Sequence, residues 1–230
     1  MRSGVLGLRL MGNGILWDTL MMKMKHISLL KRKRRNLMRV PYIALEGIDH
    51  AGKSTQISLI HKFLMKEYFP FIRIREPQDP YIMKAVRSVN GYKFKYEKEA
   101  LALLFSADRI LAINNIAWAE DRSFGILSDR SVVSSLAYQD NSEWVRVLNK
   151  FAPIPDLIIW IDIGVEEALK RSISDNPFEQ EESLKRAREN YEDIYKSGEF
   201  NIKRINGEQD IENVTEEIKE IVGGFLDDKN

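Results

Sequence analysis

The 230-residue sequence contains no cysteine, which excludes a disulfide framework, a thiolate zinc site and a cysteine nucleophile. It has only three histidines, so we do not expect a metal site built from several of them. No run of 18 apolar residues occurs, so we expect no transmembrane helix. Hydrophobic residues make up 44% of the chain, which is enough to bury a sizeable core.

The chain has a net charge of only +1, but its charges are unevenly divided. Residues 1–40 hold ten basic residues and one acidic residue, a balance of +9, whereas residues 41–230 hold 25 basic and 33 acidic residues, a balance of −8. We expect residues 1–38 to be a basic N-terminal extension that is disordered or not native, with Met38 as a natural start. A targeting presequence and a basic arm for nucleic acid are the alternatives. The acidic remainder argues against nucleic acid as a partner.

The remainder alternates short apolar runs with longer segments of helical periodicity. Strands are expected at residues 41–46, 71–75, 124–128, 156–162 and 201–206, and helices at 53–68, 97–120, 165–172, 182–196 and 210–226. Strands separated by helices need crossover connections, which favour a parallel sheet with helices on both faces. No proline- or glycine-rich linker interrupts residues 41–226. We therefore predict a single α/β domain over residues 39–228, with a central sheet of about five strands.

A phosphate-binding motif lies between the first predicted strand and the first predicted helix. It reads Gly47, Ile48, Asp49, His50, Ala51, Gly52, Lys53, Ser54, followed by Thr55, and matches G-x-x-x-x-G-K-[ST]. The glycines let successive backbone N–H groups point at phosphate oxygens, and the helix N-terminus adds a positive dipole end. Lys53 can reach the β- and γ-phosphates, and the Ser54 hydroxyl can bind Mg²⁺. The motif predicts a nucleoside triphosphate site but no particular reaction.

Asp129 and Arg130 follow the third predicted strand. Ligands of parallel sheets gather at the carboxyl ends of the strands, where an acid can hold Mg²⁺ or contact an acceptor. The structural alternative for Asp129 is a helix N-cap.

Five segments together resemble the thymidylate kinases, P-loop enzymes that phosphorylate dTMP with ATP. They are Leu45–Gln56, Arg75–Pro77, Leu103–Arg109, Asp129–Gln139, and Pro155–Leu157 with the strand ending at Asp162. The resemblance extends over residues 39–226 and implies a single P-loop kinase domain with a small lid at about 171–184. It also implies Mg-ATP as phosphoryl donor, dTMP as acceptor, dTDP as product for dTTP biosynthesis, a cytoplasmic location and a homodimer.

The resemblance also implies roles for individual residues. Asp49 would meet the acceptor sugar, Arg75 and Arg130 would bind the acceptor phosphate, and Phe105 would stack on thymine. Arg109 would contact the base or the phosphate, Tyr138 would lie against the deoxyribose, and Ser134 or Gln139 would approach the base. Without the resemblance, periodicity would favour Phe105 as a core aromatic. Ser134, Tyr138 and Gln139 would then be interpreted as ordinary helix residues, either on the surface or in the core.

For catalysis the resemblance implies Lys53, Asp129 and a lid cation, with Ser54 and Asp129 holding the metal. His50 occupies the loop position where some members of the family carry a cation, so Arg171 is our first choice for the lid cation. Three departures from the family pattern stand out: Gln78-Asp79-Pro80 in place of glycines, Ser131 in place of an aromatic or histidine, and an acidic lid. A related P-loop kinase for another nucleotide or a deoxynucleoside remains an alternative. A nucleotide-dependent nucleic-acid-binding or regulatory protein is the alternative of another class.

Overall fold

The computed structural model describes residues 40–90, 95–139, 142–172 and 177–228. The predicted basic extension lies outside the described residues. Within them, five parallel strands form one sheet in the order β2-β3-β1-β4-β5. The strands are β1 (Tyr42–Glu46), β2 (Phe71–Arg75), β3 (Gly125–Asp129), β4 (Leu157–Asp162) and β5 (Ile202–Asn206). This confirms the predicted parallel sheet and α/β class.

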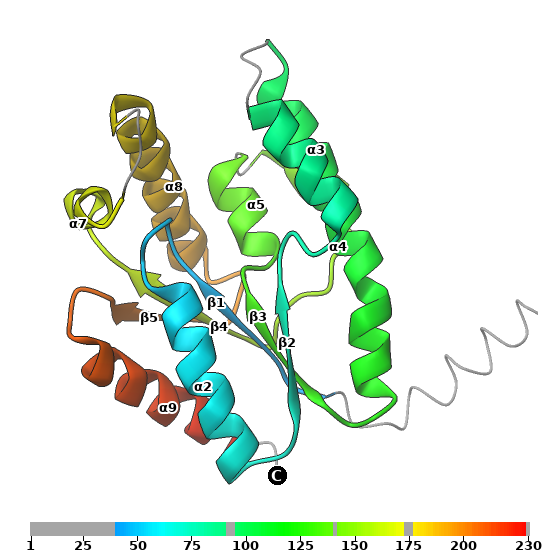
Figure 1. The fold of residues 1–230 in the computed structure, drawn as a ribbon, viewed down its shortest axis with the longest axis vertical. Coiled ribbons are helices and arrows are strands. Elements are labelled where there is room, and N and C mark those ends of the chain that lie inside the picture. The colour runs from blue at the N-terminus through cyan, green and yellow to red at the C-terminus, as the bar shows by residue number, and fades with distance from the viewer. Residues whose placement is uncertain (1–39, 91–94, 140–141, 173–176, 229–230) are drawn as a thin grey trace, which may run out of the picture. The chain divides into compact units, whose positions relative to one another are not determined.

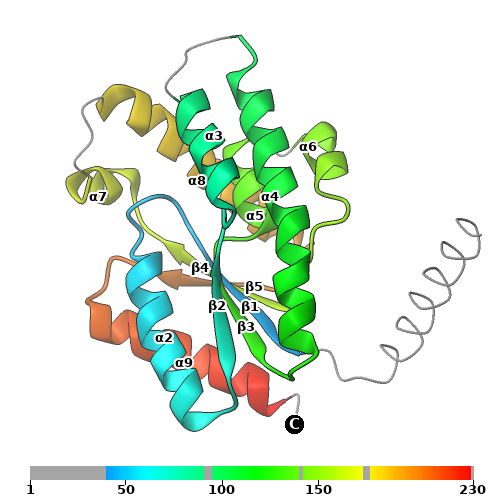
Figure 2. The same cartoon turned by 45° about the vertical axis from the view of Figure 1, so that its right-hand side comes forward.

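Helices cover both faces of the sheet (Figure 1). On one face lie α2 (Lys53–Glu67) and α9 (Ile211–Asp227). The other face carries α4 (Glu97–Glu120), α5 (Val132–Tyr138) and α8 (Pro177–Ser197). Figure 2 shows α3 (Pro80–Asn90) beside α4, and α6 (Glu143–Leu148) next to the same helix. The short α7 (Val165–Lys170) packs against α8.

The central strands β1, β3 and β4 are buried along their whole length, because helices cover both of their faces. Trp160 of β4 is 1% exposed, and its ring stacks on that of Tyr191 from α8 at 5.9 Å between centroids. This contact fixes the C-terminal half of α8 against the sheet. The carboxyl ends of the parallel strands meet at one edge, which is where the predicted site residues lie.

Three helices had no predicted range, although Ser134 and Tyr138, both in α5, were expected to be helix residues. α3 follows Asp79, whose side chain accepts hydrogen bonds from the backbone N–H groups of Tyr81 and Ile82. Asp79 before the helix and Pro80 as its first residue form an N-terminal signature that periodicity alone does not reveal. α5 and α6 span seven and six residues, too short for a clear pattern, and begin at Ser131 and Ser142, which accept hydrogen bonds as N-caps.

Most predicted boundaries shift by one or two residues in the structure, and two of the differences concern the site. β3 includes Asp129 as its last residue, so this carboxylate belongs to the strand instead of following it. α8 begins at Pro177, inside the predicted lid of residues 171–184, and residues 173–176 lie outside the described part of the chain. Much of the predicted lid is therefore the first part of a long helix.

By length and composition, α4 alone among the described helices could cross a membrane. It nevertheless carries Asp108 and Arg109, which are 1% and 2% exposed. Asp108 accepts hydrogen bonds from the backbone N–H groups of Gln78 and Asp79. These contacts tie the helix to the β2–α3 connection as part of the domain.

Candidate active site

The phosphate loop has the backbone that its glycines predict. Gly47 has φ +142° and Gly52 has φ +90°, both in the region that favours glycine, and His50 also has a positive φ of +66°. A Cβ on Gly47 would lie 2.4 Å from the carbonyl oxygen of Ile161 in β4. The loop therefore passes too close to the sheet for any side chain at its first position.

Lys53 lies under this loop as the first residue of α2 and is 7% exposed. Its Nζ donates hydrogen bonds to the carbonyl oxygens of Gly47, at 3.0 Å, and Ile48, at 2.7 Å. Burial, assisted by the positive charge of Arg130, lowers the pKa of Lys53 to about 7. A bound phosphate would add to the negative charge that Asp49, Asp129 and Glu46 already direct at the buried ammonium group.

The two predicted metal ligands are in contact. Ser54 Oγ donates a hydrogen bond of 2.9 Å to Asp129 Oδ2, across from α2 to β3. Hydroxyl and carboxylate oxygens suit Mg²⁺, which usually takes one or two protein ligands and completes its shell with phosphates and water. The described residues contain no group of three or more His, Asp or Glu that would enclose a metal by themselves. The residues present therefore fit Mg²⁺ that is shared with a nucleotide.

A cavity of about 430 Å³ adjoins the loop and this pair. It is lined by Asp49, His50, Gly52, Lys53, Ser54, Thr55, Arg75, Asp129, Arg130 and Arg171. Arg171 pairs with Glu167 one turn earlier, with Nε 2.9 Å from Oε1, and its Nη1 lies 3.4 Å from the carbonyl oxygen of His50. The predicted lid cation thus lies beside the phosphate loop.

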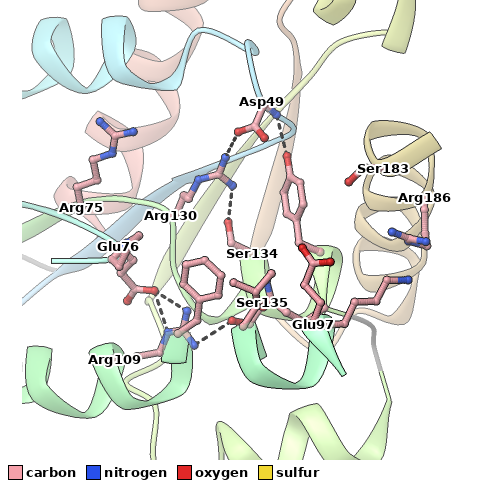
Figure 3. Close-up of a pocket in the computed structure, with 16 residues that line it drawn as sticks. Asp49, Arg75, Glu76, Glu97, Arg109, Arg130, Ser134, Ser135, Ser183 and Arg186 are labelled. Carbon is pink, nitrogen blue, oxygen red and sulfur yellow. Dashed lines mark hydrogen bonds and ion pairs between the residues drawn. The ribbon is translucent and has the colours of Figure 1, made fainter. Parts of the chain in front are cut away.

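A second cavity, of about 600 Å³, opens next to the first (Figure 3). Every residue that the resemblance assigned to the acceptor lines it: Asp49, Arg75, Phe105, Arg109, Arg130, Ser134, Tyr138 and Gln139. The sequence did not identify Glu76, Glu97 or Ser135 as lining residues. Arg186 and Ser183 of α8 lie across the cavity from Arg75. These residues come from five segments of the chain, which only the fold brings together.

Arg130 is the central side chain of this region. It forms an ion pair with Asp49, its Nη1 donates to Ser134 Oγ at 2.9 Å, and its guanidinium lies 5.2 Å from the ring centre of Tyr138. Burial opposes its charge, but Tyr138 and Asp49 raise the pKa of Arg130 above its ordinary value. Burial likewise opposes the charge of Asp49, but Arg130 and Lys53 hold the pKa of Asp49 below its ordinary value. Both groups are therefore charged at neutral pH.

Tyr138 connects the same residues to the loop. Its hydroxyl accepts a hydrogen bond of 2.8 Å from the backbone N–H of Asp49. Burial raises the pKa of Tyr138 well above its ordinary range, so the hydroxyl stays neutral. The ring thus forms a fixed wall between the phosphate loop and the second cavity.

Arg109 lines the second cavity, but its donors are already used. Its five N–H groups are directed to Glu76 Oε2 (twice), Ser135 Oγ, Asn149 Oδ1 and the carbonyl oxygen of Ser131. Burial raises the pKa of Glu76 in spite of the opposing charge of Arg109. A ligand would reach this guanidinium only in exchange for one of these bonds. In this structure Arg109 holds α4 to the segments around it.

Arg75 differs from Arg109 in being accessible. Its side chain is 72% exposed, and its Nε lies 3.9 Å from Asp129 Oδ2. It lines both cavities, as do Asp49 and Arg130. A phosphate loop beside an acid suited to Mg²⁺, joined through shared arginines to a second cavity, is the arrangement of a P-loop kinase whose acceptor carries a phosphate.

The comparisons with known proteins agree with this class. The thymidylate kinase family model matches residues 45–218. The chain is 37% identical over 189 residues to a probable thymidylate kinase of Methanobrevibacter smithii, covering 80% of this chain and 95% of that protein. Relatives with the same description occur in Methanosphaera stadtmanae (38% identical, 80% and 98% covered) and Thermococcus gammatolerans (34% identical, 79% and 95% covered). The chain belongs to the thymidylate kinase family, whose members are ATP-dependent nucleoside monophosphate kinases.

Proposed function

We propose that this enzyme transfers the γ-phosphoryl group of Mg-ATP to dTMP, giving dTDP for dTTP biosynthesis, in the cytoplasm. One observation carries the proposal: Asp49, Arg75 and Arg130 line both cavities, so two nucleotides bound there would present their phosphates to the same residues. Such positioning, together with charge stabilisation, is what phosphoryl transfer requires.

On the donor side, the loop amides of residues 47–55 and Lys53 hold the phosphates of ATP. Ser54 and Asp129 hold Mg²⁺, which neutralises phosphate charge when it is bound. Arg171, close to the loop carbonyl of His50, is positioned to reach the transferred group. Lys53 has to leave its bonds with the loop carbonyls to meet the phosphates, and their negative charge favours its protonated form.

On the acceptor side, Arg75 and Arg130 bind the phosphate of dTMP, Tyr138 lies beside the deoxyribose, and Phe105 stacks on the base. Gln139 lines the cavity, and its Oε1 is buried without a hydrogen-bond partner among the described residues. The amide would have to turn toward the cavity, where its oxygen could accept a hydrogen bond from the N3–H of a thymine base. Arg109 supports the cavity wall through the five bonds described above.

We expect dTMP to be the preferred acceptor in a coupled assay of ADP release with dTMP, dUMP, dCMP, dGMP and thymidine. Cytosine has no N3–H to donate to Gln139, so kcat/KM for dCMP should be at least about tenfold lower, the cost of one unpaired buried group. Thymidine should give no turnover, because it has no phosphate for Arg75 and Arg130. A preference for thymidine or dCMP would instead favour the deoxynucleoside kinase or another nucleotide kinase.

We also propose that the enzyme is a homodimer that buries the outer face of α4. Leu103, Leu111 and Trp118 are 52%, 50% and 45% exposed and recur at seven- to eight-residue spacing, which places them on one face of the helix. Such a stripe of large apolar side chains marks a protein contact more often than a solvated surface. Its length along α4 suits contact with a second copy of the same helix.

Leu111→Glu is expected to halve the molecular mass measured by light scattering, from two chains of 26.7 kDa to one. The added carboxylates would face each other across the symmetric contact, where an unpaired buried charge is costly. Met65→Glu is the matched control, since Met65 is equally exposed at 50% but lies on α2, on the other face of the sheet. A single-chain mass for the unmodified protein, or an unchanged mass for the Leu111 variant, would contradict the proposed contact.

A further inference from the structure

Glu46 is a buried carboxylate that the site described above does not use. It is the last residue of β1, directly before the phosphate loop, and it is 0% exposed. In the part of the chain that the structure describes, it forms no ion pair, and it lines neither of the two cavities. Burying a carboxylate in this way is costly unless hydrogen bonds compensate, so its partners are informative.

Four donors converge on Glu46 from two helices. Oε1 accepts from Ser131 Oγ at 2.7 Å and from the backbone N–H of Ser134 at 3.2 Å. Oε2 accepts from Ser134 Oγ at 2.7 Å and from Tyr191 Oη at 2.8 Å. Three of these bonds come from the start of α5 and one from α8. The carboxylate therefore has its main contacts with the segment that follows Arg130.

The contacts continue from Ser134 to the reacting region. A carboxylate only accepts hydrogen bonds, so the Ser134 hydroxyl donates its hydrogen to Glu46 and presents a lone pair to Arg130 Nη1, 2.9 Å away. Arg130 then pairs with Asp49 in the phosphate loop. Its backbone has φ +77°, a conformation that side-chain-bearing residues rarely adopt and that surrounding contacts must hold in place.

We propose that Glu46 is a positioning residue for the acceptor phosphate: it orients Ser134, and through Ser134 it holds the guanidinium of Arg130 between the two cavities. This inference rests on the proposed function, because Arg130 is taken as a ligand of the dTMP phosphate. It also explains Ser131, which departs from the family pattern by placing a small hydroxyl where it donates to Glu46.

Glu46→Gln keeps the size of the side chain and replaces one accepting oxygen by an N–H₂ donor. Whichever way the amide is oriented, its N–H₂ group faces a group that donates a hydrogen bond to Glu46 in the unmodified protein. We expect KM for dTMP to rise about tenfold, the size of one lost hydrogen bond in a buried network. KM for ATP should rise much less, because Lys53 and the loop amides form no hydrogen bond with Glu46 and feel only its charge. Initial-rate kinetics with each substrate varied in turn would measure both constants.

Ser134→Ala should raise KM for dTMP to a similar extent, and the double variant should be no worse than the more impaired single variant, because both substitutions interrupt the same connection. Tyr195→Phe is the control: Tyr195 lies one turn after Tyr191 on α8, its ring also packs on Trp160 at 5.8 Å, and it forms no hydrogen bond with Glu46 or Ser134. It should leave KM for dTMP unchanged.

The inference would be overturned by an unchanged KM for dTMP in Glu46→Gln, by equal increases in both KM values, or by additive effects of the two substitutions. If Glu46→Gln fails to fold, an unchanged KM for dTMP in Ser134→Ala would also overturn the inference. Absence of dTMP phosphorylation by the unmodified enzyme would refute the proposed function instead, so the two failures are distinguishable.

Discussion

Lys53→Met is expected to lower kcat about 10³-fold, the effect of removing a preorganised charged donor from a phosphoryl-transfer site. Methionine has nearly the length and volume of lysine, so the space under the phosphate loop stays filled. The substitution removes only the ammonium group that would otherwise leave the carbonyls of Gly47 and Ile48 for the phosphates. Steady-state assays with saturating ATP and dTMP would measure the loss.

The same variant should be at least as stable as the unmodified enzyme. Burial lowers the pKa of Lys53 in the folded protein to about 7, below its ordinary 10.5, so the unfolded chain binds more protons between these values. The free energy of unfolding contributed by this group therefore rises as pH increases from about 7 to 10.5. Methionine carries no such penalty, so Tm should be equal or higher at pH 7 and depend less on pH.

Lys62→Met is the control, since Lys62 lies exposed on the same helix and lines neither cavity. Its kcat and its pH dependence of stability should match those of the unmodified enzyme. Near-normal turnover by the Lys53 variant would contradict both the assigned role of this residue and the proposed reaction.

Gly47→Ala is expected to cost about 3 kcal/mol or more of unfolding free energy, because two effects add. The new Cβ would lie 2.4 Å from the carbonyl oxygen of Ile161, a backbone atom in the central strand β4 that cannot move aside. The backbone at Gly47, with φ +142°, is also unfavourable for alanine. The loop would be displaced from β4, so ATP binding should be lost as well. Urea unfolding and ATP titration would measure the two losses.

Gly224→Ala provides the matched control. Gly224 lies within α9, and apart from the adjoining helix backbone no heavy atom of the described residues lies within 4 Å of a Cβ built there. Alanine is the better helix former, so this variant should be about 0.5–1 kcal/mol more stable than the unmodified protein. If the two variants were equally stable, the close approach of the loop to β4 would be disproved.

The order of strands and helices could be predicted because the patterns that specify it are local. The apolar run ending at Asp162 and the long periodic segment at residues 97–120 each occupy their predicted places within one residue. Of the helices that escaped prediction, α3 is marked by a local start signal, Asp79 followed by Pro80. α5 and α6, with seven and six residues, are too short for a helical period to repeat. Their serine caps are local features that would have indicated α5 and α6.

The candidate site likewise has features that the sequence predicts and features that it does not. The phosphate loop is one contiguous motif, and its chemistry follows from the order of its residues. The acceptor residues were named from the resemblance, and all of them line one cavity. Their availability could not be known from the motif: Arg75 is open to solvent, whereas Arg109 is enclosed by bonds to Glu76 and Asn149, 33 and 40 residues away in the chain.

By itself, the sequence determined the fold class, the phosphate loop and the family resemblance, because periodicity and contiguous motifs act over a few residues. The tertiary structure decided which of the named side chains remain available for a ligand and which hold the others in place. Glu46 shows the difference: its partner Tyr191 lies 145 residues further along the chain, and only the packing of α8 on the sheet brings them to 2.8 Å. Burial and hydrogen bonding between distant segments are properties of the folded chain, and they decide what each charged group in the site can do.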